Sequence, residues 1–411
     1  MGGRQTSLMS TVIIGGGAAG CFAAVFSARS GDRVILLEPN GRLGRKLSIT
    51  GKGRCNITNN CDLDTLMKNV TKNPSFLYSA FSRFGTGDCM KFIEELGVPL
   101  KTERGNRVFP VSDRAIDVVN ALEREIKRLG VETVWERAND IVTEDGAVAA
   151  VKTDKRLIRT EKVILATGGI SYKATGSTGD GYRLAKRLGH TVTELKPSLI
   201  PLETEEDCFP AAGLTVKNAV LTLSDTKNGK KLFDQMGELT FEEYGVGGAL
   251  VLSASARLPR IEKGRYVINI DFKPALDNKK LDLRLQREIT ADGKAELQRI
   301  MRTLLPEKLI TLVLRQAGAD PAKKAAEVSS KLRKSLVSVL KGFTLTVKGF
   351  RPINEAIVTD GGVDVSEINP GDMQSRLVRG LHFAGEIIDV CGYTGGFNLQ
   401  IAYSTARCAV E

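Results

Sequence analysis

Three glycines near the start of the chain have the spacing of a dinucleotide-binding loop. They are Gly15, Gly17 and Gly20, and they follow an apolar run typical of a buried parallel strand. In such a loop the first glycine makes the turn, the second lets a pyrophosphate approach the backbone, and the third lets the next helix pack closely on the strand. The N–H groups of Ala18 and Ala19, where this helix begins, then point toward the anion. The spacing therefore predicts a dinucleotide site.

An acidic residue stands where the ribose of such a dinucleotide would lie. A second apolar run at residues 34–37 ends at Glu38, which is followed by Pro39. An acid at the tip of the second strand suits the hydroxyls of an adenosine ribose. A glycine motif alone could be an ordinary tight turn. Strand, glycines, helix, strand and acid in one unit favour the dinucleotide.

A long basic loop rich in glycine follows at residues 41–60. It has no helical or strand periodicity, and it fails as a phosphate-binding Walker loop because Lys46 and Gly53 stand where glycine and Ser or Thr are needed. Long loops without structure are uncommon in compact domains unless they are functional. We expect this loop to return over the cofactor. Its candidate cofactor contacts are Arg45, Lys46, Gly51, Gly53, Arg54, Cys55 and Asn56.

Two later segments repeat the pattern of an apolar strand that ends in glycine. One is residues 162–169, before a helix expected over 180–188, and the other is residues 381–386, before a terminal helix expected to end near residue 408. A nicotinamide dinucleotide does not need the last element, whereas the longer FAD needs partners beyond its pyrophosphate. The candidate contacts in these segments are Thr167, Gly168, Gly169, Asp180, Gly385, Glu386, Asp389, Gly396, Phe397, Asn398 and Leu399.

Roles for part of this set follow from helix electrostatics. Glu386 or Asp389 could hold the ribityl hydroxyls of FAD. The N–H groups of Asn398 and Leu399, at the start of the terminal helix, would lie near the pyrimidine edge of the flavin and stabilise its anionic reduced form.

The elements that must position these residues form an α/β pattern with an insertion. From His190 the sequence pattern changes to short runs in which apolar and polar residues alternate. Residues 279–341 then have apolar residues at helical spacing. The pattern of the nucleotide-binding part of the chain resumes near Gly349. We therefore expect a Rossmann-type FAD-binding domain in two parts, 1–190 and 349–411. A β-rich domain (191–275) and a helical domain (276–348) would interrupt it.

Composition narrows the class further. The 411 residues carry 59 Lys and Arg against 48 Asp and Glu, a formal charge of +11 that suits anionic cofactors and substrates. Seven cysteines without a closely spaced pair, and only two histidines, favour a reducing cytoplasm and give no basis for a metal site. No apolar run has the length of a membrane span. Residues 1–10 lack the apolar segment of a signal peptide and are expected to form a loose tail.

Several blocks together resemble one protein family. They are GGGAAG, GRKLSITGKGRCNITN, ATGGISYKATGSTGDGYRLAKRLGH, PSLIPL, AIVTDGGV and LHFAGEIIDVCGYTGGFNLQIAYSTA. In this order they resemble the bacterial HI0933-like flavoproteins, relatives of the fumarate reductase and ketosteroid dehydrogenase flavoproteins. The resemblance implies an FAD-binding domain of the GR2 type, interrupted by a β-rich and a small helical domain. It also implies an oxidoreductase, because the family includes bile-acid-inducible reductases of 3-oxo-Δ4 steroids and proteins assigned as aminoacetone oxidases.

The sequence departs from the family pattern at three positions. Lys173 stands where proline is frequent, Glu243 where histidine is usual, and Cys391 where an acid is frequent. The first two lie near the expected substrate side, so the substrate stays open, whereas the FAD prediction is unaffected.

The leading hypothesis is NAD(P)H-dependent reduction of a C=C bond conjugated with a ketone, in a hydrophobic and acidic substrate of the 3-oxo-Δ4 bile-acid type. NADH or NADPH would reduce the flavin, whose N5 would deliver hydride to the β-carbon, and a general acid would protonate the α-carbon. Because no second dinucleotide motif exists, NAD(P)H would bind transiently, or another donor would replace it. The candidate acids, chosen by adjacency to the flavin motifs, are Tyr172, Tyr393, Arg54 and Lys173.

Two alternatives stay open. One is a flavin oxidase of a small amine such as aminoacetone. The other is a flavin-dependent RNA-binding or RNA-modifying protein, suggested by the basic balance but disfavoured because the sequence shows no aromatic stacking platform.

Overall fold

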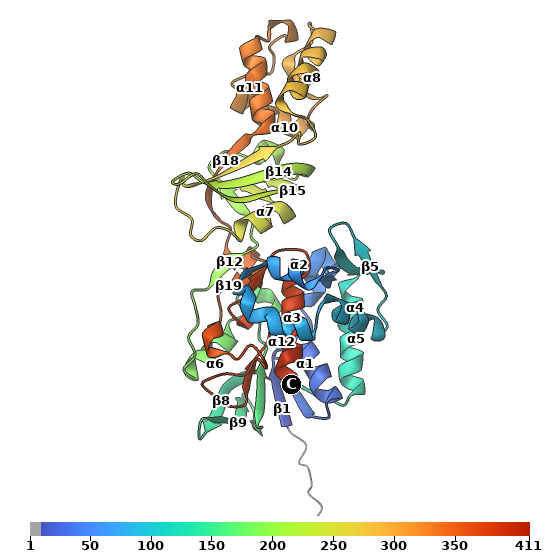
Figure 1. Cartoon of the computed structure of the whole chain (residues 1–411), viewed down its shortest axis with the longest axis vertical. Coiled ribbons are helices and arrows are strands. Elements are labelled where there is room, and N and C mark those ends of the chain that lie inside the picture. The colour runs from blue at the N-terminus through green and yellow to red at the C-terminus, as the bar shows by residue number, and fades with distance from the viewer. Residues whose placement is uncertain (1–9) are drawn as a thin grey trace, which may run out of the picture. The chain divides into compact units, whose positions relative to one another are not determined.

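The computed structural model describes residues 10–411, which divide into two compact units (Figure 1). The sheet unit comprises the described residues up to Pro197 together with Ala356–Glu411, and the barrel unit is Ser198–Glu355. The loose tail expected at residues 1–10 lies outside the described residues, apart from Ser10, which begins the first strand. Among the described residues, no helix combines the length and the apolarity that crossing a membrane requires.

A five-stranded parallel sheet forms the centre of the sheet unit. Its order is β20 (Leu381–Phe383), β11 (Lys162–Leu165), β1 (Ser10–Ile14), β2 (Arg33–Leu37) and β7 (Glu132–Val134). Four of them, β1, β2, β11 and β20, are the apolar runs of the sequence and are almost wholly buried, as parallel strands usually are, whereas β7 at the edge is partly exposed. The carboxyl ends of parallel strands lie along one edge of the sheet. The glycine segments after β1, β11 and β20 therefore meet at that edge.

Three helices pack against this sheet or beside it. They are α1 (Ala18–Arg29), α5 (Ala115–Arg128) and the terminal α12 (Phe397–Val410). The α12 helix is buried along almost its whole length, and its Tyr403 stacks on Phe22 of α1 with ring centroids 3.9 Å apart. This packing holds the N-terminal ends of α1 and α12 in a fixed relation.

Smaller elements complete the sheet unit. A three-stranded sheet contains β8 (Ala138–Glu144), β9 (Ala147–Thr153) and β10 (Leu157–Arg159), and another contains β3 (Thr58–Asn59), β5 (Leu100–Glu103) and β6 (Arg107–Pro110). The pairs β4 (Val70–Lys72) with β21 (Cys391–Gly392) and β12 (Lys196–Ser198) with β19 (Val358–Asp360) are short. The further helices are α2 (Leu63–Lys68), α3 (Tyr78–Arg83), α4 (Thr86–Glu95) and α6 (Asp180–Arg187).

The barrel unit contains a closed six-stranded barrel and a group of helices. The barrel order is β13 (Leu202–Thr204), β16 (Gly245–Gly247), β15 (Lys230–Glu242), β14 (Thr215–Asp225), β17 (Tyr266–Asp271) and β18 (Phe343–Phe350). The helices are α7 (Gly248–Ser255), α8 (Asn278–Ala291), α9 (Leu297–Met301), α10 (Glu307–Ala317) and α11 (Ser330–Lys341). One hydrophobic cluster runs through the barrel and the helices, so the two parts share a core.

Candidate functional site

The first glycine motif leaves an open cradle at the start of α1. A Cβ on Gly15 would lie 2.6 Å from the Ala166 carbonyl oxygen, and one on Gly20 would lie 1.7 Å from the Gly15 oxygen, so packing requires both glycines. At Gly17, no described atom lies within 4 Å of the place where a Cβ would stand. Gly17 caps α1, and no side chain of the described residues bonds to the N–H groups of its first turn. The N–H groups of Ala18 and Ala19 can therefore hold a phosphate.

Glu38 lies against this cradle. Its Oε2 accepts a hydrogen bond of 2.9 Å from the Gly16 N–H, and its Oε1 accepts from the backbone and the side chain of Asn40 at 2.9 and 2.6 Å. The residue is buried, but two carboxylate oxygens offer about four acceptor positions, so capacity remains for ribose hydroxyls. Pro39, beside it, is exposed.

The basic loop returns onto the same motif, and it is more ordered than its sequence indicates. The Gly44 N–H donates to the Gly16 oxygen at 2.8 Å. The prediction that residues 41–60 lack regular structure is wrong, because Leu47–Gly53 forms 3₁₀ turns and Thr58–Asn59 forms β3. Apolar periodicity could not reveal them, since the turns include left-handed conformations at Gly51 and Lys52, and Gly53 and Cys55 also have positive φ angles.

The middle of the loop reaches the glycine segments after β11 and β20. Lys46 Nζ donates to Glu386 Oε2 at 2.8 Å and to Ser171 Oγ at 2.7 Å, and Arg45 donates to the Ala174 oxygen at 2.7 Å. Burial acts to raise the pKa of Glu386, but the charge of Lys46 and hydrogen bonds outweigh it, and the pKa lies below its ordinary value. Glu386 is therefore an ionised carboxylate held by a cation.

The end of the loop meets the start of α12. Thr58 Oγ1 donates to Gln400 Oε1 at 2.6 Å, and a Cβ on Gly396 would lie 2.4 Å from the Thr58 backbone. Asn56, with its amide oriented to satisfy its neighbours, accepts from the Gly396 N–H at 3.0 Å. Gly396 caps α12, and within residues 10–411 no side chain caps that helix and no acid lies in its first turn.

The N–H groups of Phe397, Asn398 and Leu399 at that helix start are thus free for a ligand. The Asn398 side chain is occupied elsewhere, because it accepts from the Gly392 N–H at 2.9 Å and donates to the Gly392 oxygen at 2.8 Å. Asn398 can serve a cofactor through its backbone only.

The remaining cofactor candidates lie around these contacts. A Cβ on Gly385 would be 2.9 Å from the Ala19 Cβ, so the segment after β20 closely approaches the start of α1. The Thr167 hydroxyl is buried with no hydrogen-bond partner among the described residues, which leaves it to a ligand. Gly168 has a positive φ angle, and a Cβ on Gly169 would lie 2.3 Å from Thr359 Oγ1.

Two acidic candidates are held by cations. Asp180 pairs with Arg137 and accepts from Thr178 at 2.9 Å, and Asp389 lies 2.7 Å from Lys72 Nζ. Both are members of ion pairs, and within residues 10–411 neither bonds to loop 41–60.

The candidate acids differ in their surroundings. Tyr172 is half-buried in a left-handed conformation (φ +50°), Lys173 is exposed, and Tyr393 is buried. Arg54 donates to Asp113 at 2.6 Å and to Glu103, and lies 4.2 Å over the Phe109 ring. Hydrogen bonds to Glu103 and Asp113 raise the pKa of its guanidinium, which makes it a poorer proton donor.

Sequence reasoning missed two residues that hold Glu386. Ser171 donates to Glu386 Oε1 at 3.1 Å, and the Thr359 N–H donates to the same oxygen at 2.7 Å. The Thr359 hydroxyl also accepts from the Ile170 N–H at 2.8 Å. Both residues lie in blocks that carry the family resemblance, and this was the available signal.

Loop 41–60 therefore contacts all the glycine segments that the sequence assigns to FAD. Among the described residues, two helix starts with free N–H groups, a buried hydroxyl without a partner and an acid beside the first motif match the parts of that cofactor. The residues present fit FAD.

Comparisons with known proteins agree with this geometry. The model of the HI0933-like protein Rossmann domain matches residues 9–411. A 3-dehydro-bile acid delta(4,6)-reductase of Clostridium scindens is 31% identical over 402 residues, 97% of each chain. A ribosomal RNA dihydrouridine synthase of Haemophilus influenzae is 29% identical over 409 residues, again 97% of each chain.

The fold is also that of a solved flavoprotein. The 3-ketosteroid-delta4-(5alpha)-dehydrogenase from Rhodococcus jostii matches 99% of this chain and 98% of its own with a TM-score of 0.51, at 15% identity. The predicted family and fold class are thereby confirmed. The chain belongs to the HI0933-like family of flavin-dependent oxidoreductases, built on a Rossmann-type FAD-binding domain.

Proposed function

We propose that this protein is an FAD-dependent reductase that saturates a C=C bond conjugated with a carbonyl, with NADH or NADPH as electron donor. The observation that carries the proposal is the course of loop 41–60, which joins all the glycine segments at the carboxyl edge of the sheet. FAD, when bound, supplies the hydride.

The residues around FAD bind and orient the cofactor, and one of them protonates the substrate. The N–H groups of Ala18 and Ala19 would hold the pyrophosphate of FAD, and Glu38 would hold its ribose. The pair Lys46–Glu386 offers a cation and an anion for the ribityl chain and the flavin. The N–H groups at the start of α12 would hold the pyrimidine side of the flavin and would favour added negative charge there.

The proton donor is assigned to a tyrosine. Tyr172 and Tyr393 carry hydroxyl groups beside the flavin segments, whereas Arg54 is committed to two carboxylates. Lys173 is exposed, so its ammonium is well solvated, and it is the weaker candidate.

Both named relatives support the same chemistry on different molecules. A delta(4,6)-reductase of a 3-dehydro-bile acid saturates ring double bonds near a ketone. A dihydrouridine synthase saturates the C5=C6 bond of uracil, which is conjugated with the C4 carbonyl. A hydride at the β-carbon and a proton at the α-carbon complete either reaction.

A 3-oxo-Δ4 steroid or bile acid is the first candidate substrate, on the strength of the reductase relative. A second candidate, uracil within ribosomal RNA, is favoured by a specific observation. Residues 273–341 hold sixteen Lys and Arg against eight Asp and Glu, so this one segment carries most of the net charge of the chain. Polyanions select such a surface and neutral steroids do not.

The test begins with the purified protein and its flavin spectrum. The flavin is reduced anaerobically with NADH or NADPH and then mixed separately with a 3-oxo-Δ4 steroid, a 3-oxo-Δ4 bile acid and unmodified ribosomal RNA. Reoxidation by one of them, with the saturated product found by mass spectrometry, supports the proposal and selects the substrate. Reduction of the flavin by aminoacetone, followed by release of peroxide when O₂ is admitted to reoxidise it, would contradict the proposal in favour of an oxidase.

A further inference from the structure

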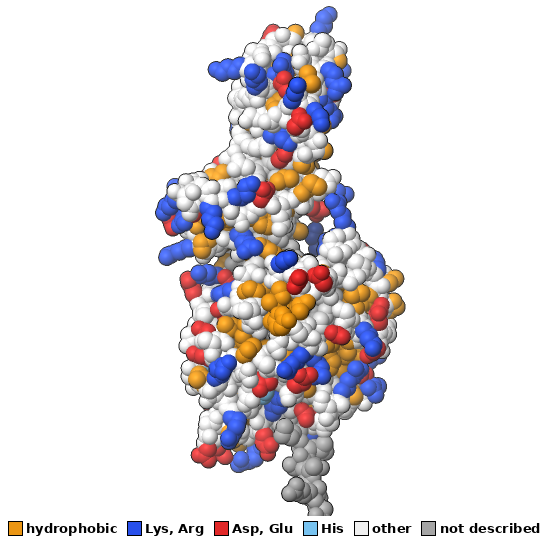
Figure 2. Space-filling model, viewed as in Figure 1, with side chains coloured by type: hydrophobic (Ala, Val, Ile, Leu, Met, Phe, Trp, Pro, Cys, Tyr) orange, Lys and Arg blue, Asp and Glu red, His pale blue; other side chains and the backbone are white. Residues whose placement is uncertain are grey.

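The helices of the barrel unit carry an unusual excess of positive side chains. Figure 2 shows Lys and Arg side chains spread over the part formed by α8 to α11, with fewer Asp and Glu between them. Part of this charge is neutralised locally, as in the pairs Arg333–Asp282 and Arg302–Glu307. Positive side chains that no carboxylate neutralises are available to a partner.

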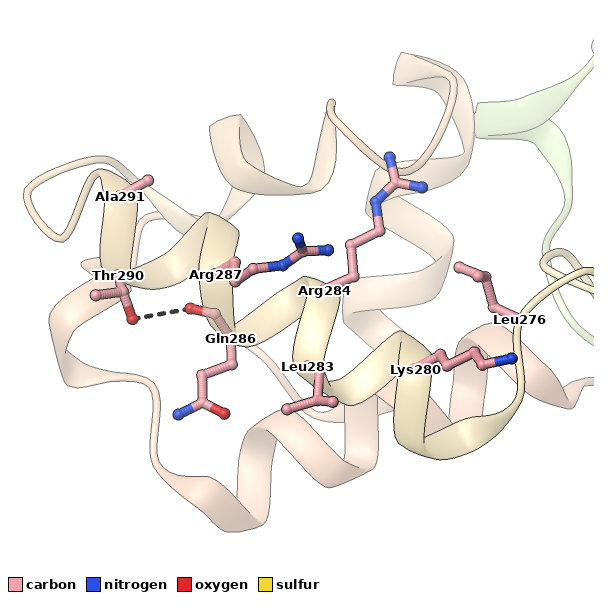
Figure 3. Close-up of a pocket in the computed structure, with 8 residues that line it drawn as sticks. All are labelled: Leu276, Lys280, Leu283, Arg284, Gln286, Arg287, Thr290 and Ala291. Carbon is pink, nitrogen blue, oxygen red and sulfur yellow. Dashed lines mark hydrogen bonds between the residues drawn. The ribbon is translucent and has the colours of Figure 1, made fainter.

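A groove along α8 holds such charge. Lys280, Arg284 and Arg287 line it, and their spacing of four and three residues places them on successive turns of one face of the helix (Figure 3). Arg284 and Arg287 meet no carboxylate at ion-pair distance within residues 10–411, while Lys280 lies 3.6 Å from Asp277. Seven residues of helix correspond to a stripe about 10 Å long.

Further positive charge reaches the same place. Burial and the nearby Arg284 guanidinium lower the pKa of Lys273, so these two cations are close to each other. Arg284 Nη2 donates to the Thr303 oxygen at 3.2 Å, which holds the guanidinium in place. Crowded like charges of this kind are relieved by a bound polyanion.

The groove does not suit a lipid surface. Two of the apolar residues of α8, Leu281 and Leu285, are fully buried in the core, and Ile289 packs against it. Leu283 is the one large apolar side chain of α8 that is mostly exposed. An interfacial helix needs a broad apolar face to enter the headgroup region, and α8 has no such face left.

We propose that the α8 groove binds the phosphate backbone of RNA, with Lys280, Arg284 and Arg287 each contacting a phosphate. This inference rests on the proposed function in its RNA form. It adds a docking surface in the barrel unit to a chemical site in the sheet unit. The contacts to phosphate give affinity and position, not sequence selection.

The test measures binding separately from chemistry. Fluorescence anisotropy of a fluorescein-labelled oligouridine is followed with the FAD-loaded protein over a range of KCl concentrations. The slope of log affinity against log salt should be shallower by about 2 in a K280Q/R284Q/R287Q variant, since each phosphate contact on a single strand contributes about 0.7. Affinity at moderate salt should fall at least about tenfold.

Two further variants guard the interpretation. K91Q/R124Q/K127Q removes equal charge from exposed positions on α4 and α5 and should leave the slope within about half a unit of the parent. K280Q/R287Q keeps Arg284 and its bond to Thr303. Because it removes two of the three phosphate contacts, it should show about two-thirds of the decrease in slope seen with the triple variant. If the α4/α5 variant lost as much RNA affinity and salt slope as the α8 triple variant, the inference would be overturned. Phosphatidylglycerol vesicles that bind through α8 more tightly than RNA would also overturn it.

Failure of the surface and failure of the reductase are distinguishable. NAD(P)H-driven reduction of a free 3-oxo-Δ4 steroid or of uridine needs no docking surface, and the triple variant should retain it. A protein that turns over such a small acceptor while its RNA binding ignores α8 refutes the surface alone. A protein that binds RNA through α8 but reduces no conjugated acceptor supports the surface and refutes the reductase.

Discussion

Helices α12 and α8 are both fourteen residues long, yet they meet their surroundings in opposite ways. In α12 most residues are buried, and the helix begins at Gly396 with no capping side chain among the described residues. In α8 only Leu281 and Leu285 are buried, and Asp277 caps the helix by accepting from the Lys280 N–H at 2.7 Å. One helix offers backbone N–H groups at its end, and the other offers side-chain charge along its face.

Because of this difference, the two units would bind their ligands in different ways, one through backbone groups and the other through charged side chains. The sheet unit can hold a fixed cofactor through backbone groups that glycine leaves uncovered, and such a site tolerates little change in geometry. The barrel unit presents long, exposed side chains that can adapt to a large anionic partner. Substitutions that affect one unit and spare the other would support this distinction, and substitutions that affect both units would contradict it.

The largest effect is expected in the barrel core. Phe241 is fully buried, with ring centroids 6.4 Å from Phe272 and 6.3 Å from Phe343. Phe241→Ala should lower the free energy of unfolding of the barrel unit by about 3–5 kcal/mol. The single tryptophan, Trp135, lies in the sheet unit, so its fluorescence should report urea unfolding at an unchanged midpoint. Phe209→Ala, at an exposed position, is the control, and a shift of the Trp135 transition would mean that the units are coupled.

The next effect concerns the cradle of α1. Gly17 has a negative φ angle and open space around it, so Gly17→Val should leave the fold nearly intact, at a cost of about 1 kcal/mol for the poorer cap. FAD affinity should fall at least about a hundredfold, because the side chain fills the space of the phosphate. The fraction of flavin released on dilution of the protein measures this affinity. Gly20→Ala, where the Cβ would clash with the Gly15 oxygen, should instead destabilise the protein. If the Gly17→Val variant retained FAD, the phosphate of the cofactor would have to bind at a place other than the start of α1.

These two predictions show where sequence reasoning is strong. The apolar runs that became β1, β2, β11 and β20, and the glycines after them, are local patterns, because a buried parallel strand and a tight turn each need a particular residue type at one place. The family and the fold class followed from such patterns and are confirmed.

Other features could not be predicted, because they depend on residues far apart in the chain. Lys46 and Glu386 are 340 positions apart, and strand β13 pairs with β18 to close the barrel. The sequence contains many lysines and acids, and nothing local says which lysine will meet which acid. The same reason explains Arg54, which sequence adjacency placed among the candidate acids and which the fold binds to Glu103 and Asp113.

The Lys46–Glu386 pair provides a smaller and more specific test. Both side chains are mostly buried, so Lys46→Met should lower the stability of the sheet unit by about 2–3 kcal/mol, because it leaves a carboxylate without its cation. Lys46→Met combined with Glu386→Gln should recover part of that loss in a double-mutant cycle. In the barrel unit, Lys231→Met breaks an exposed pair with Asp234 and should cost less than about 1 kcal/mol. Equal costs for the two lysines would contradict the burial argument.

The smallest effect is a pH dependence confined to the sheet unit, which contains both histidines of the chain. His382 in β20 contacts the Asp372 carbonyl oxygen at 2.9 Å, and burial and the nearby Lys162 lower its pKa to about 4. Because its unfolded pKa is about 6.5, the unfolded chain binds more protons between pH 4 and 6.5, and stability falls as the pH drops through that window. Between pH 7 and pH 4.5 this contribution should reach about 2 kcal/mol in urea unfolding followed by Trp135, and His382→Gln should remove it. His190 remains in both proteins as the internal reference, and the barrel transition should show no histidine-linked change. An unchanged slope in the His382→Gln protein would assign the acid sensitivity to His190, whose pKa burial also lowers, and to the carboxylates of the sheet unit instead.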